Sequence, residues 1–352
     1  MAAINYGIFD TRNMLEVVRV LTPPSSMLLD LFFPTELRSN SEFISFDVIK
    51  KKRRLAPFIH PLVKGANQGR DGYDQRAIKP AYVKMLRLSQ AAELIKTAPG
   101  ENPFADRSIQ QRAADLLVED LQDTDEQLTR RLEWMAARAL TEFKVPIVGE
   151  GFNFTLDFLQ DAEHIVDDPA ALEGGQAGGW GAAGTDPFRD LDNEAKKIAR
   201  NGGQRMTDVV MGDLAWEAYI SNQTVIDRLN NRRIDPGMVI QEPLRSGSIF
   251  RGNIGGYNIW SDYDWYYDEV ASEDKPMVPD NYVVCGSRLA RTAVHFGQIL
   301  DLGAPGGAPV RSFPKAQELF DPSGVELLVQ SAPIVAIHEV SAFTRIKVLP
   351  DA

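Results

Sequence analysis

The side chains that most often carry catalysis lie far apart in this sequence. The four histidines, His60, His164, His295 and His338, include no pair at the spacing of a helical metal site. The single cysteine, Cys285, ends the apolar run Tyr-Val-Val-Cys, which is typical of a buried, inert thiol. The Gly-x-Ser-x-Gly motif of serine hydrolases does not occur. The sequence therefore predicts no catalytic residue, no metal site and no cofactor.

An aromatic and acidic run at residues 260–269 is the strongest remaining candidate for chemistry. Aromatic rings that stack on sugars and paired carboxylates are typical of carbohydrate-binding and hydrolytic sites. Spacing alone does not bring any two of its carboxylates together, and packing at a strand end explains the same residues. A soluble carbohydrate-binding or hydrolytic enzyme built on Trp260–Glu269 therefore stays as an alternative function. The aromatic members of the run are Trp260, Tyr263, Trp265, Tyr266 and Tyr267.

The composition is that of a folded protein without a membrane span. The chain has 352 residues, of which 44% are hydrophobic and 25% charged, so it can bury a substantial core. No apolar run approaches the roughly 20 residues that cross a bilayer, and the first residues lack the pattern of a secretory signal. A single cysteine excludes an intramolecular disulfide, so we expect folding in a reducing cytoplasm.

The net charge of −11 is unevenly distributed. Residues 1–98 hold 15 Lys and Arg against 9 Asp and Glu, whereas the remaining residues hold 23 against 40. A basic front and an acidic body indicate that the front of one chain could lie on the body of another, although the asymmetry could also serve solubility alone. The acidic body argues against tight, nonspecific binding of DNA, which requires Lys and Arg at the phosphates.

Residues 106–142 show the clearest helical periodicity. Apolar side chains recur there at intervals of three and four residues. A continuous helix of this length spans about 55 Å, close to the ~50 Å diameter of a compact protein of this size. We therefore expect a plate or wedge, although Asp123-Thr124-Asp125 could cap a second, collinear helix. The predicted buried face consists of Leu117, Leu121, Leu128, Leu132 and Met135.

The front of the chain combines short elements with a basic run. We expect a helix over residues 10–21, and an apolar cluster over 27–33 that forms either core or a docking arm. A strand over 43–49 is followed by Lys50-Lys51-Lys52-Arg53-Arg54. Such a basic run indicates a nucleic-acid contact, a localisation signal, or a strand end that faces solvent or a partner.

A polar, glycine-rich segment at residues 64–84 forms no core of its own. We expect a long excursion between a strand near 43–60 and a second strand near 78–88. Two strands without a hydrophobic layer need a surface to lie on. Another subunit can supply that surface.

The rest of the chain mixes strands and helices. Alternating residues on both sides of Gly149-Glu150-Gly151 predict a hairpin over 145–158. Residues 172–187 predict a flexible connection and a domain boundary. Residues 327–349 predict a pair of strands, with Pro333 indicating a sheet edge. Further helices are expected over 190–200 and 213–230, and further strands over 207–211, 258–260 and 282–285.

Seven short segments occur in a fixed order along nearly the whole chain. They are Asp-Thr-Arg-Asn-Met-Leu (10–15), Ser-Met-Leu-Leu-Asp-Leu-Phe-Phe-Pro (26–34), Leu-Ala-Pro-Phe (55–58), Ile-Lys-Pro-Ala-Tyr-Val-Lys (78–84), Arg-Arg-Leu-Glu-Trp-Met-Ala-Ala-Arg-Ala-Leu (130–140), Trp180 before Asp186-Pro187, and Gln-Ser-Ala-Pro (330–333). Their joint order and spacing resemble the lambda-type major capsid proteins, the E family of tailed bacteriophages. The glycine-rich residues 172–184 and the aromatic run at 260–267 match no family motif.

This resemblance implies an α+β fold of the Hong Kong 97 type. A protein of this fold has an N-terminal arm, an extended β-hairpin loop, a long spine helix, and peripheral and axial domains. Carried over by position, these parts are an arm at 1–40, an extended loop at 41–92, a peripheral domain with the spine helix at 93–184, an axial domain at 185–320, and C-terminal strands at 321–352 that return to the peripheral domain.

The resemblance also implies a function in assembly. The protein is expected to self-assemble through hexamers and pentamers into the icosahedral shell of a tailed phage, made in the host cytoplasm and enclosing double-stranded DNA without sequence-specific binding. Scaffold, portal and decoration proteins are expected partners, and no membrane is involved. Another virion part, such as a tail-tube protein, stays as a second alternative. Contacts between subunits are expected at Phe32, Phe33, Lys50, Lys51, Lys52, Arg53, Arg54, Arg70, Lys79 and Tyr82.

Overall fold

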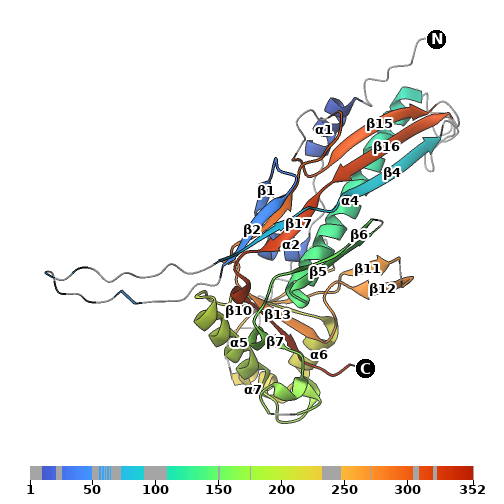
Figure 1. Cartoon of the computed structure of the whole chain (residues 1–352). Coiled ribbons are helices and arrows are strands. Elements are labelled where there is room, and N and C mark those ends of the chain that lie inside the picture. The colour runs from blue at the N-terminus through green and yellow to red at the C-terminus, as the bar shows by residue number, and fades with distance from the viewer. Residues whose placement is uncertain are drawn as a thin grey trace.

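The computed structural model shows an elongated molecule, narrow at one end and broad at the other (Figure 1). One long helix runs through the narrow half, and a six-stranded sheet lies in the broad half. The structure describes residues 10–20, 26–49, 73–90, 109–149, 151–174, 176–231, 247–269, 271–303, 309–319 and 323–351, together with residues 55, 56, 58, 60, 62 and 64.

The long helix, α4 (Ile109–Thr141), is continuous over 33 residues and spans about 50 Å. The expected alternative of two collinear helices is wrong. Thr124 donates from Oγ1 to the carbonyl of Asp120 at 2.9 Å, and Thr129 donates to the carbonyl of Asp125 at 2.8 Å. These hydroxyls bond to the preceding turn of the same helix instead of capping a new one.

Two three-stranded sheets lie along α4. The first has the order β15 (Phe313–Leu319), β16 (Gly324–Ser331) and β4 (Val83–Gln90), and one of its faces packs against α4 and α1 (Thr11–Val20). The second has the order β1, β14 and β17 and lies near α2. Pro333 opens β17, which pairs only with β14 in this sheet, so the predicted edge position is confirmed. These elements are β1 (Glu36–Arg38), β14 (Thr292–Phe296), β17 (Pro333–Ile337) and α2 (Met27–Phe32).

The broad half is built on a mixed six-stranded sheet. Helices α5, α6 and α7 pack with this sheet around a hydrophobic cluster of their own. The strands, in sheet order, are β7 (Ile165–Val166), β18 (Phe343–Lys347), β13 (Tyr282–Gly286), β8 (Asp208–Met211), β10 (Tyr257–Ser261) and β9 (Ile249–Ile254), and the helices are α5 (Pro187–Asn201), α6 (Asp213–Ser221) and α7 (Gln223–Asn231).

In the described part of the chain, three two-stranded hairpins leave the body. The extended hairpin, β2 (Ile44–Ile49) with β3 (Tyr73–Ile78), lies on the opposite side of the body from the other two (Figure 1). These are β5 (Lys144–Gly149) with β6 (Phe152–Asp157), as predicted, and β11 (Trp265–Asp268) with β12 (Glu273–Pro276). The turn between β5 and β6 places Gly151 at a φ of +82°, a conformation that glycine adopts without strain.

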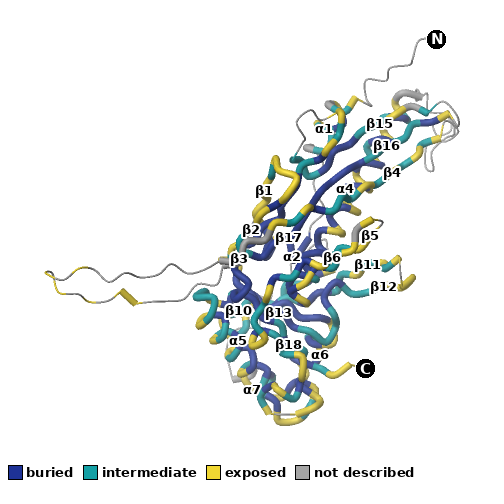
Figure 2. Tube along the Cα trace, viewed as in Figure 1, coloured by how far each residue is buried: buried dark blue, intermediate teal, exposed yellow. Residues whose placement is uncertain are grey.

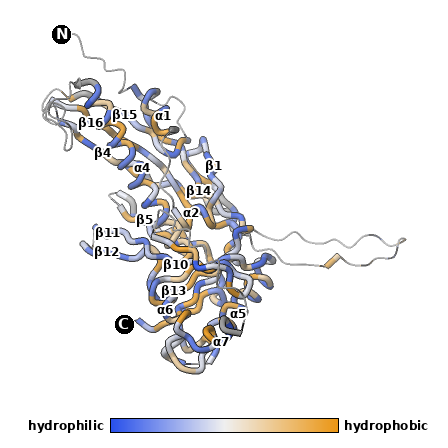
Figure 3. The backbone as a smooth tube through the Cα atoms, turned by 180° about the vertical axis from the view of Figure 1, so that it is seen from behind, coloured by the Kyte–Doolittle hydropathy of each residue, from blue (hydrophilic) through white to orange (hydrophobic). Residues whose placement is uncertain are grey.

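The largest hydrophobic cluster lies where the two halves meet. It joins α2 and the C-terminal half of α4 to strands of the second three-stranded sheet and the six-stranded sheet. Figure 2 shows this buried region in the middle of the molecule, with exposed segments at both ends. Figure 3 shows from behind that the hydrophobic stretches alternate with hydrophilic ones along most elements, as expected where each strand or helix has one buried side.

Strand pairing corrects four expectations. The partner of β2 is β3, not a strand near 78–88, because Pro80 separates β3 from β4 and β4 pairs with β16. The expected axial domain, residues 185–320, contains strands β14 and β15, but these strands belong to the sheets beside α4. The C-terminal strands at 321–352 were expected to return to the peripheral domain, but one of them, β18, joins the six-stranded sheet. Residues 327–349 therefore contribute to three strands in three sheets rather than to one pair of strands.

The expected helix over 213–230 is divided into α6 and α7 at Asn222. The Asn222 side chain accepts a hydrogen bond from the backbone N–H of Thr224 at 3.0 Å, which is the geometry of a helix cap. Its amide also donates to the carbonyl of Trp180 at 3.2 Å. The break therefore ties α7 to the glycine-rich segment.

Candidate assembly surfaces

The predicted buried face of α4 is buried within the chain. Leu117 and Leu121 pack with Met14 of α1 and with two β16 residues, Leu327 and Val329. The rest of the face, Leu128, Leu132 and Met135, joins the largest cluster. This face therefore supports the sheets of its own chain and does not form an outer surface.

Helix α2 is fastened to α4 by the buried side chain of Glu133. Glu133, on α4, is 4% exposed, and its two oxygens accept hydrogen bonds from the backbone N–H groups of Leu28 and Leu29 at 2.6 and 3.0 Å. These N–H groups belong to the first turn of α2, where the helix itself offers no acceptor. Glu133 thus joins two elements that lie more than 100 residues apart.

Burial raises the pKa of Glu133 to about 8. The two backbone donors oppose this rise because they favour the charged carboxylate, and the acidic groups of Asp262 and Asp264 add to it. Burial also raises the pKa of Asp262 to about 6. Helix α2 therefore contacts α4 at a point where proton binding is coupled to packing.

Phe32 and Phe33 do not reach the surface, so their expected contact with another subunit is wrong. Phe32 is 1% exposed and Phe33 is 2% exposed, and both belong to the largest cluster. The rings of Phe32 and Phe343 meet edge to face, with their centroids 5.4 Å apart. The backbone carbonyl of Phe32 accepts a hydrogen bond from the Thr292 hydroxyl. These aromatic residues fix the end of α2 to the rest of its own chain.

Two histidines meet at the base of the extended hairpin. His295 lies on β14 and His338 follows β17, and their Nε2 atoms are 3.4 Å apart. The Nδ1 atom of His338 lies 3.3 Å from the carbonyl oxygen of Asp47 on β2. Burial, and then the nearby His338, lower the pKa of His295 to about 4, and burial lowers the pKa of His338.

Two of the expected contact residues, Lys79 and Tyr82, lie between the extended hairpin and β4. Lys79 forms an exposed ion pair with Glu42, with Nζ and Oε1 2.6 Å apart. The Tyr82 hydroxyl donates to the carbonyl of Gln298 at 2.9 Å and accepts from the N–H of Leu300 at 3.0 Å. Tyr82 therefore positions a loop of its own chain. The basic residues Lys50, Lys51, Lys52, Arg53 and Arg54, and also Arg70, lie outside the described residues.

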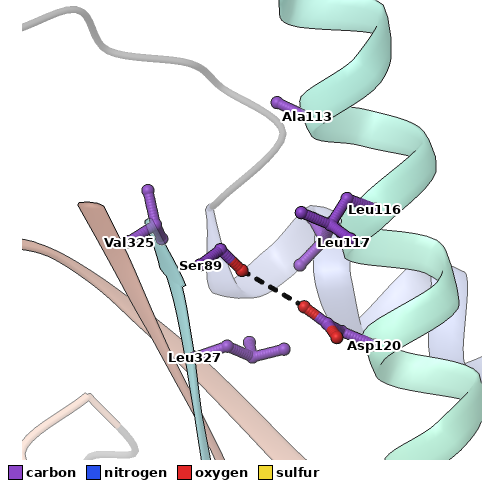
Figure 4. Close-up of a pocket in the computed structure, with 7 residues that line it drawn as sticks. All are labelled: Ser89, Ala113, Leu116, Leu117, Asp120, Val325 and Leu327. Atoms are coloured by element: carbon purple, nitrogen blue, oxygen red, sulfur yellow. Dashed lines mark hydrogen bonds between the residues drawn. The ribbon is translucent and has the colours of Figure 1, made fainter. Parts of the chain in front are cut away.

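A small pocket lies between α4 and strands β4 and β16 (Figure 4). Its polar atoms are already engaged: Asp120 accepts hydrogen bonds from Ser89 at 3.3 Å and from Arg87 at 3.2 Å. Burial raises the pKa of Asp120, against the opposing effect of Arg87. Because the remaining lining is apolar, this pocket is a packing gap and offers no free polar group for a ligand. Its apolar lining consists of Ala113, Leu116, Leu117, Val325 and Leu327.

A buried aspartate organises the six-stranded sheet. Asp208, on β8, accepts two hydrogen bonds from the Arg288 guanidinium at 2.6 and 2.7 Å and one from the Trp260 indole at 3.0 Å. Burial acts to raise the pKa of Asp208, but these hydrogen bonds outweigh burial and lower it. The ion pair of Asp208 with Arg288 therefore orders the strand ends. A carboxylate whose pKa is lowered in this way is poorly suited to act as a general acid.

The glycine-rich residues 172–187 are not a flexible connection. Trp180 is 1% exposed and donates from its indole to Asp190 at 2.8 Å, and its backbone N–H donates to the carbonyl of Val348 at 2.9 Å. A Cβ atom on Gly179 would lie 1.9 Å from that same carbonyl oxygen. Glycine is thus required here for close approach of two backbones, and the expected boundary is a packed part of the fold.

The aromatic run is divided between packing and exposure. Trp260 bonds to Asp208, the Tyr263 hydroxyl accepts from Arg251 at 2.6 Å, and the Tyr266 hydroxyl accepts from Arg138 at 2.9 Å. Trp265 and Tyr267 instead face outward from the hairpin β11–β12. Three of the five aromatic groups are therefore held by structural hydrogen bonds.

The described residues offer little for other chemistry. Cys285 is buried, and burial raises the pKa of its thiol, which disfavours a reactive thiolate. Within the described ranges, no three His, Cys, Asp or Glu side chains gather in a way that could hold a metal ion. None of the described helices combines the length and apolar character needed to cross a membrane.

Sequence reasoning missed two relationships at these surfaces. The histidine pair joins residues 43 positions apart, and only the pairing of β14 with β17 brings them together. The hydrogen bonds that Glu133 accepts from α2 had a weak signal, a single acidic residue among the apolar residues from Leu132 to Met135. A buried ionisable side chain at such a position indicates a specific partner.

Comparisons with known proteins place the whole chain in one family. The family model described as phage major capsid protein E matches residues 10–348. The P21 prophage-derived major head protein of Escherichia coli O6:H1 strain CFT073 is 22% identical over 348 residues, which is 97% of this chain and 99% of that protein. The major capsid protein of Enterobacteria phage P21 matches with the same values.

A solved structure shares the fold. The crystal structure of a protein assigned to the capsid of a prophage of Escherichia coli CFT073 superposes with a TM-score of 0.73. The two chains are 20% identical, and the match covers 99% of each. The expected α+β fold of phage capsid proteins is thereby confirmed.

Proposed function

This chain belongs to the phage major capsid protein E family, and on that premise we propose that it forms the closed icosahedral head shell around the double-stranded DNA of a tailed phage. It is a major capsid protein of a phage or prophage. Proteins of this kind assemble into shells of many copies. The proposal concerns which parts of this chain make that assembly possible.

The observation that carries the proposal is apolar surface left open beyond the extended hairpin. Between β2 and β3, the described side chains of Leu55, Phe58 and Leu62 are 93%, 108% and 89% exposed. Full burial of such a side chain contributes roughly 1.5–3 kcal/mol. A single chain leaves this contribution unused, whereas a neighbouring copy can cover all three.

The sheet pairing supports a revised division of the chain into working parts. The arm, taken as residues 1–40, is held by Glu133 and ends with β1, and the extended loop, taken as 41–92, contains the hairpin β2–β3 and ends with β4, which pairs with β16. A peripheral part consists of α4 with the other strands of the two three-stranded sheets, β14, β15, β16 and β17. An axial part consists of the six-stranded sheet with α5, α6 and α7, and includes β18.

Assembly follows from heterologous contacts that close by symmetry. Copies joined through hexamers and pentamers are each held by several neighbours at once, so individually modest contacts suffice for a stable shell. The net charge of −11 keeps the shell from gripping the enclosed DNA tightly. Scaffold, portal and decoration proteins complete the proposed set of partners, and assembly takes place in the host cytoplasm.

This role requires no covalent step, so we propose that the protein is not an enzyme. The alternative of a carbohydrate-binding or hydrolytic site on Trp260–Glu269 is weakened by the hydrogen bonds that commit Trp260, Tyr263 and Tyr266 to packing. A tail-tube protein remains distinguishable by the shape of its product, which is a tube.

Electron microscopy of the purified chain tests the proposal. The wild type should form closed, roughly spherical particles, whereas a variant with Leu55, Phe58 and Leu62 all replaced by Ser should stay folded by circular dichroism but fail to close. A control variant, Ala56→Ser with Lys64→Ser, changes exposed neighbours in the same segment and should assemble normally. Tubes, or a monomer with saturable sugar binding, would favour the alternatives. Equal assembly of the serine triple variant and the control would remove the proposed role of this segment.

A further inference from the structure

The hairpin β11–β12 has an inner face that is fully used. Tyr266 points toward α4, where its hydroxyl accepts a hydrogen bond from Arg138 at 2.9 Å. Its ring lies 6.4 Å from the ring of Trp134 in an edge-to-face arrangement. The hairpin is therefore fixed on the body and does not depend on a partner for its position.

Its outer face carries two exposed aromatic side chains. Trp265 is 49% exposed and Tyr267 is 59% exposed, and their spacing of two residues puts them on the same face of the strand. Across the hairpin they pair with Pro276 and Asp274. Trp and Tyr are enriched among the residues that carry binding energy at protein interfaces, so this face has the composition of a contact surface.

The charge around these rings selects the kind of partner. Residues 265–276 hold four acidic side chains and a single basic one, Lys275. Lys275 is already engaged, with its Nζ atom 2.7 Å from Asp268 and 3.3 Å from Glu273. A negatively charged surface repels nucleic acid and attracts a basic segment, whose cations can also stack on the exposed rings.

The sequence supplies one run of matching charge, Lys50–Arg54, which directly follows β2. The extended hairpin β2–β3 and the hairpin β11–β12 lie on opposite sides of the body (Figures 1 and 2). Two complementary patches on opposite sides of one molecule suit a head-to-tail contact between copies.

We propose that the outer face of β11–β12 binds the basic run Lys50–Arg54 of a second copy of this chain. This inference rests on the proposed shell function and names one contact within it. Trp265 and Tyr267 form the apolar centre of the contact, and Asp274, which pairs with Tyr267 across the hairpin, lies beside them as an acidic group. The aromatic run that matches no family motif thereby acquires a role.

Cross-linking between introduced cysteines tests the contact directly. In a background with the buried Cys285 replaced by Ala, the double variant R53C/D274C is assembled and treated with a short bismaleimide. Because each copy would meet a different neighbour at each end, the expected product is a ladder of covalent multimers, about tenfold more abundant than in the matched pair R53C/K196C. Lys196 is exposed on α5, away from the proposed contact. The single variants R53C and D274C should give no ladder.

Two further outcomes separate this inference from the shell proposal. Adding Trp265→Ser and Tyr267→Ser to R53C/D274C should reduce the ladder at least about fivefold, because the apolar centre is lost. Particles that form normally while R53C/D274C gives no more ladder than the control pair would overturn the contact and leave the shell. A ladder without closed particles would support the contact and contradict the shell, and the absence of both would contradict both.

Discussion

The Nε2 atoms of His295 and His338 lie 3.4 Å apart, and the second of these rings also contacts the backbone of Asp47 on the extended hairpin. Both rings are held with a lowered pKa, that of His295 at about 4, chiefly because they are buried. Two positive charges at this distance would repel each other strongly. The neutral pair is therefore part of the structure that joins the extended hairpin to the body.

This pair predicts a loss of stability in acid. The unfolded chain takes up protons near the ordinary histidine pKa of 6.5, whereas folded His295 does so only near 4, so acidification across this interval favours unfolding. The shift corresponds to roughly 3 kcal/mol at most. Urea unfolding at pH 7.5 and pH 4 should show the wild type losing more stability than His295→Gln, which cannot be protonated. The exposed His60→Gln should behave as the wild type, and equal losses in all three proteins would contradict the prediction.

Glu133 predicts the opposite dependence on pH. Its pKa is raised to about 8 in the folded protein, so the stability it contributes is greatest below the ordinary carboxyl pKa of 4.5 and falls as the pH rises toward 8. The variant Glu133→Gln keeps an acceptor for the α2 backbone without this titration. Its unfolding free energy, relative to the wild type, should therefore rise between pH 5 and pH 8. A constant difference across that range would show that Glu133 is charged throughout.

Gly179 should tolerate no side chain. In Gly179→Ala the new Cβ would meet the carbonyl oxygen of Val348 at 1.9 Å, and we expect a loss of about 3 kcal/mol or more. Gly184 also has a positive φ, of +86°, but a Cβ atom added there would have no other atom within 4 Å, so Gly184→Ala isolates the backbone strain at about 1 kcal/mol. Thermal unfolding of the two variants measures the difference. Similar melting temperatures would show that the backbone contact can relax.

Leu128 should be among the costliest truncations on α4. It is fully buried in the largest cluster, and Leu128→Ala should lower the unfolding free energy by about 2–5 kcal/mol. The adjacent, exposed Gln127→Ala should change it by less than about 0.5 kcal/mol. Chemical denaturation provides both values. A small effect of Leu128→Ala would mean that the largest hydrophobic cluster is loosely packed around Leu128.

Local patterns in the sequence were sufficient to predict the elements whose residues interact with near neighbours. The periodicity of residues 106–142 predicted α4 and placed its end within one residue of Thr141, because one face of a helix must be apolar wherever it is buried. The alternation around Gly149 and Gly151 predicted the hairpin β5–β6 for the same kind of reason. The ordered segments along the chain also identified the family.

Tertiary structure alone decided which distant elements meet. No local pattern states that Glu133 accepts hydrogen bonds from α2, that β18 crosses into the six-stranded sheet, or that His295 lies against His338. These relationships depend on how strands separated by tens to hundreds of residues pair, and loop-closing contacts of that range leave no periodic signal. The glycine-rich residues 172–187 make the same point, since their composition suggests flexibility but a neighbouring backbone requires their small size. The sequence determined the elements and the family, and packing between distant segments determined the surfaces through which copies can meet.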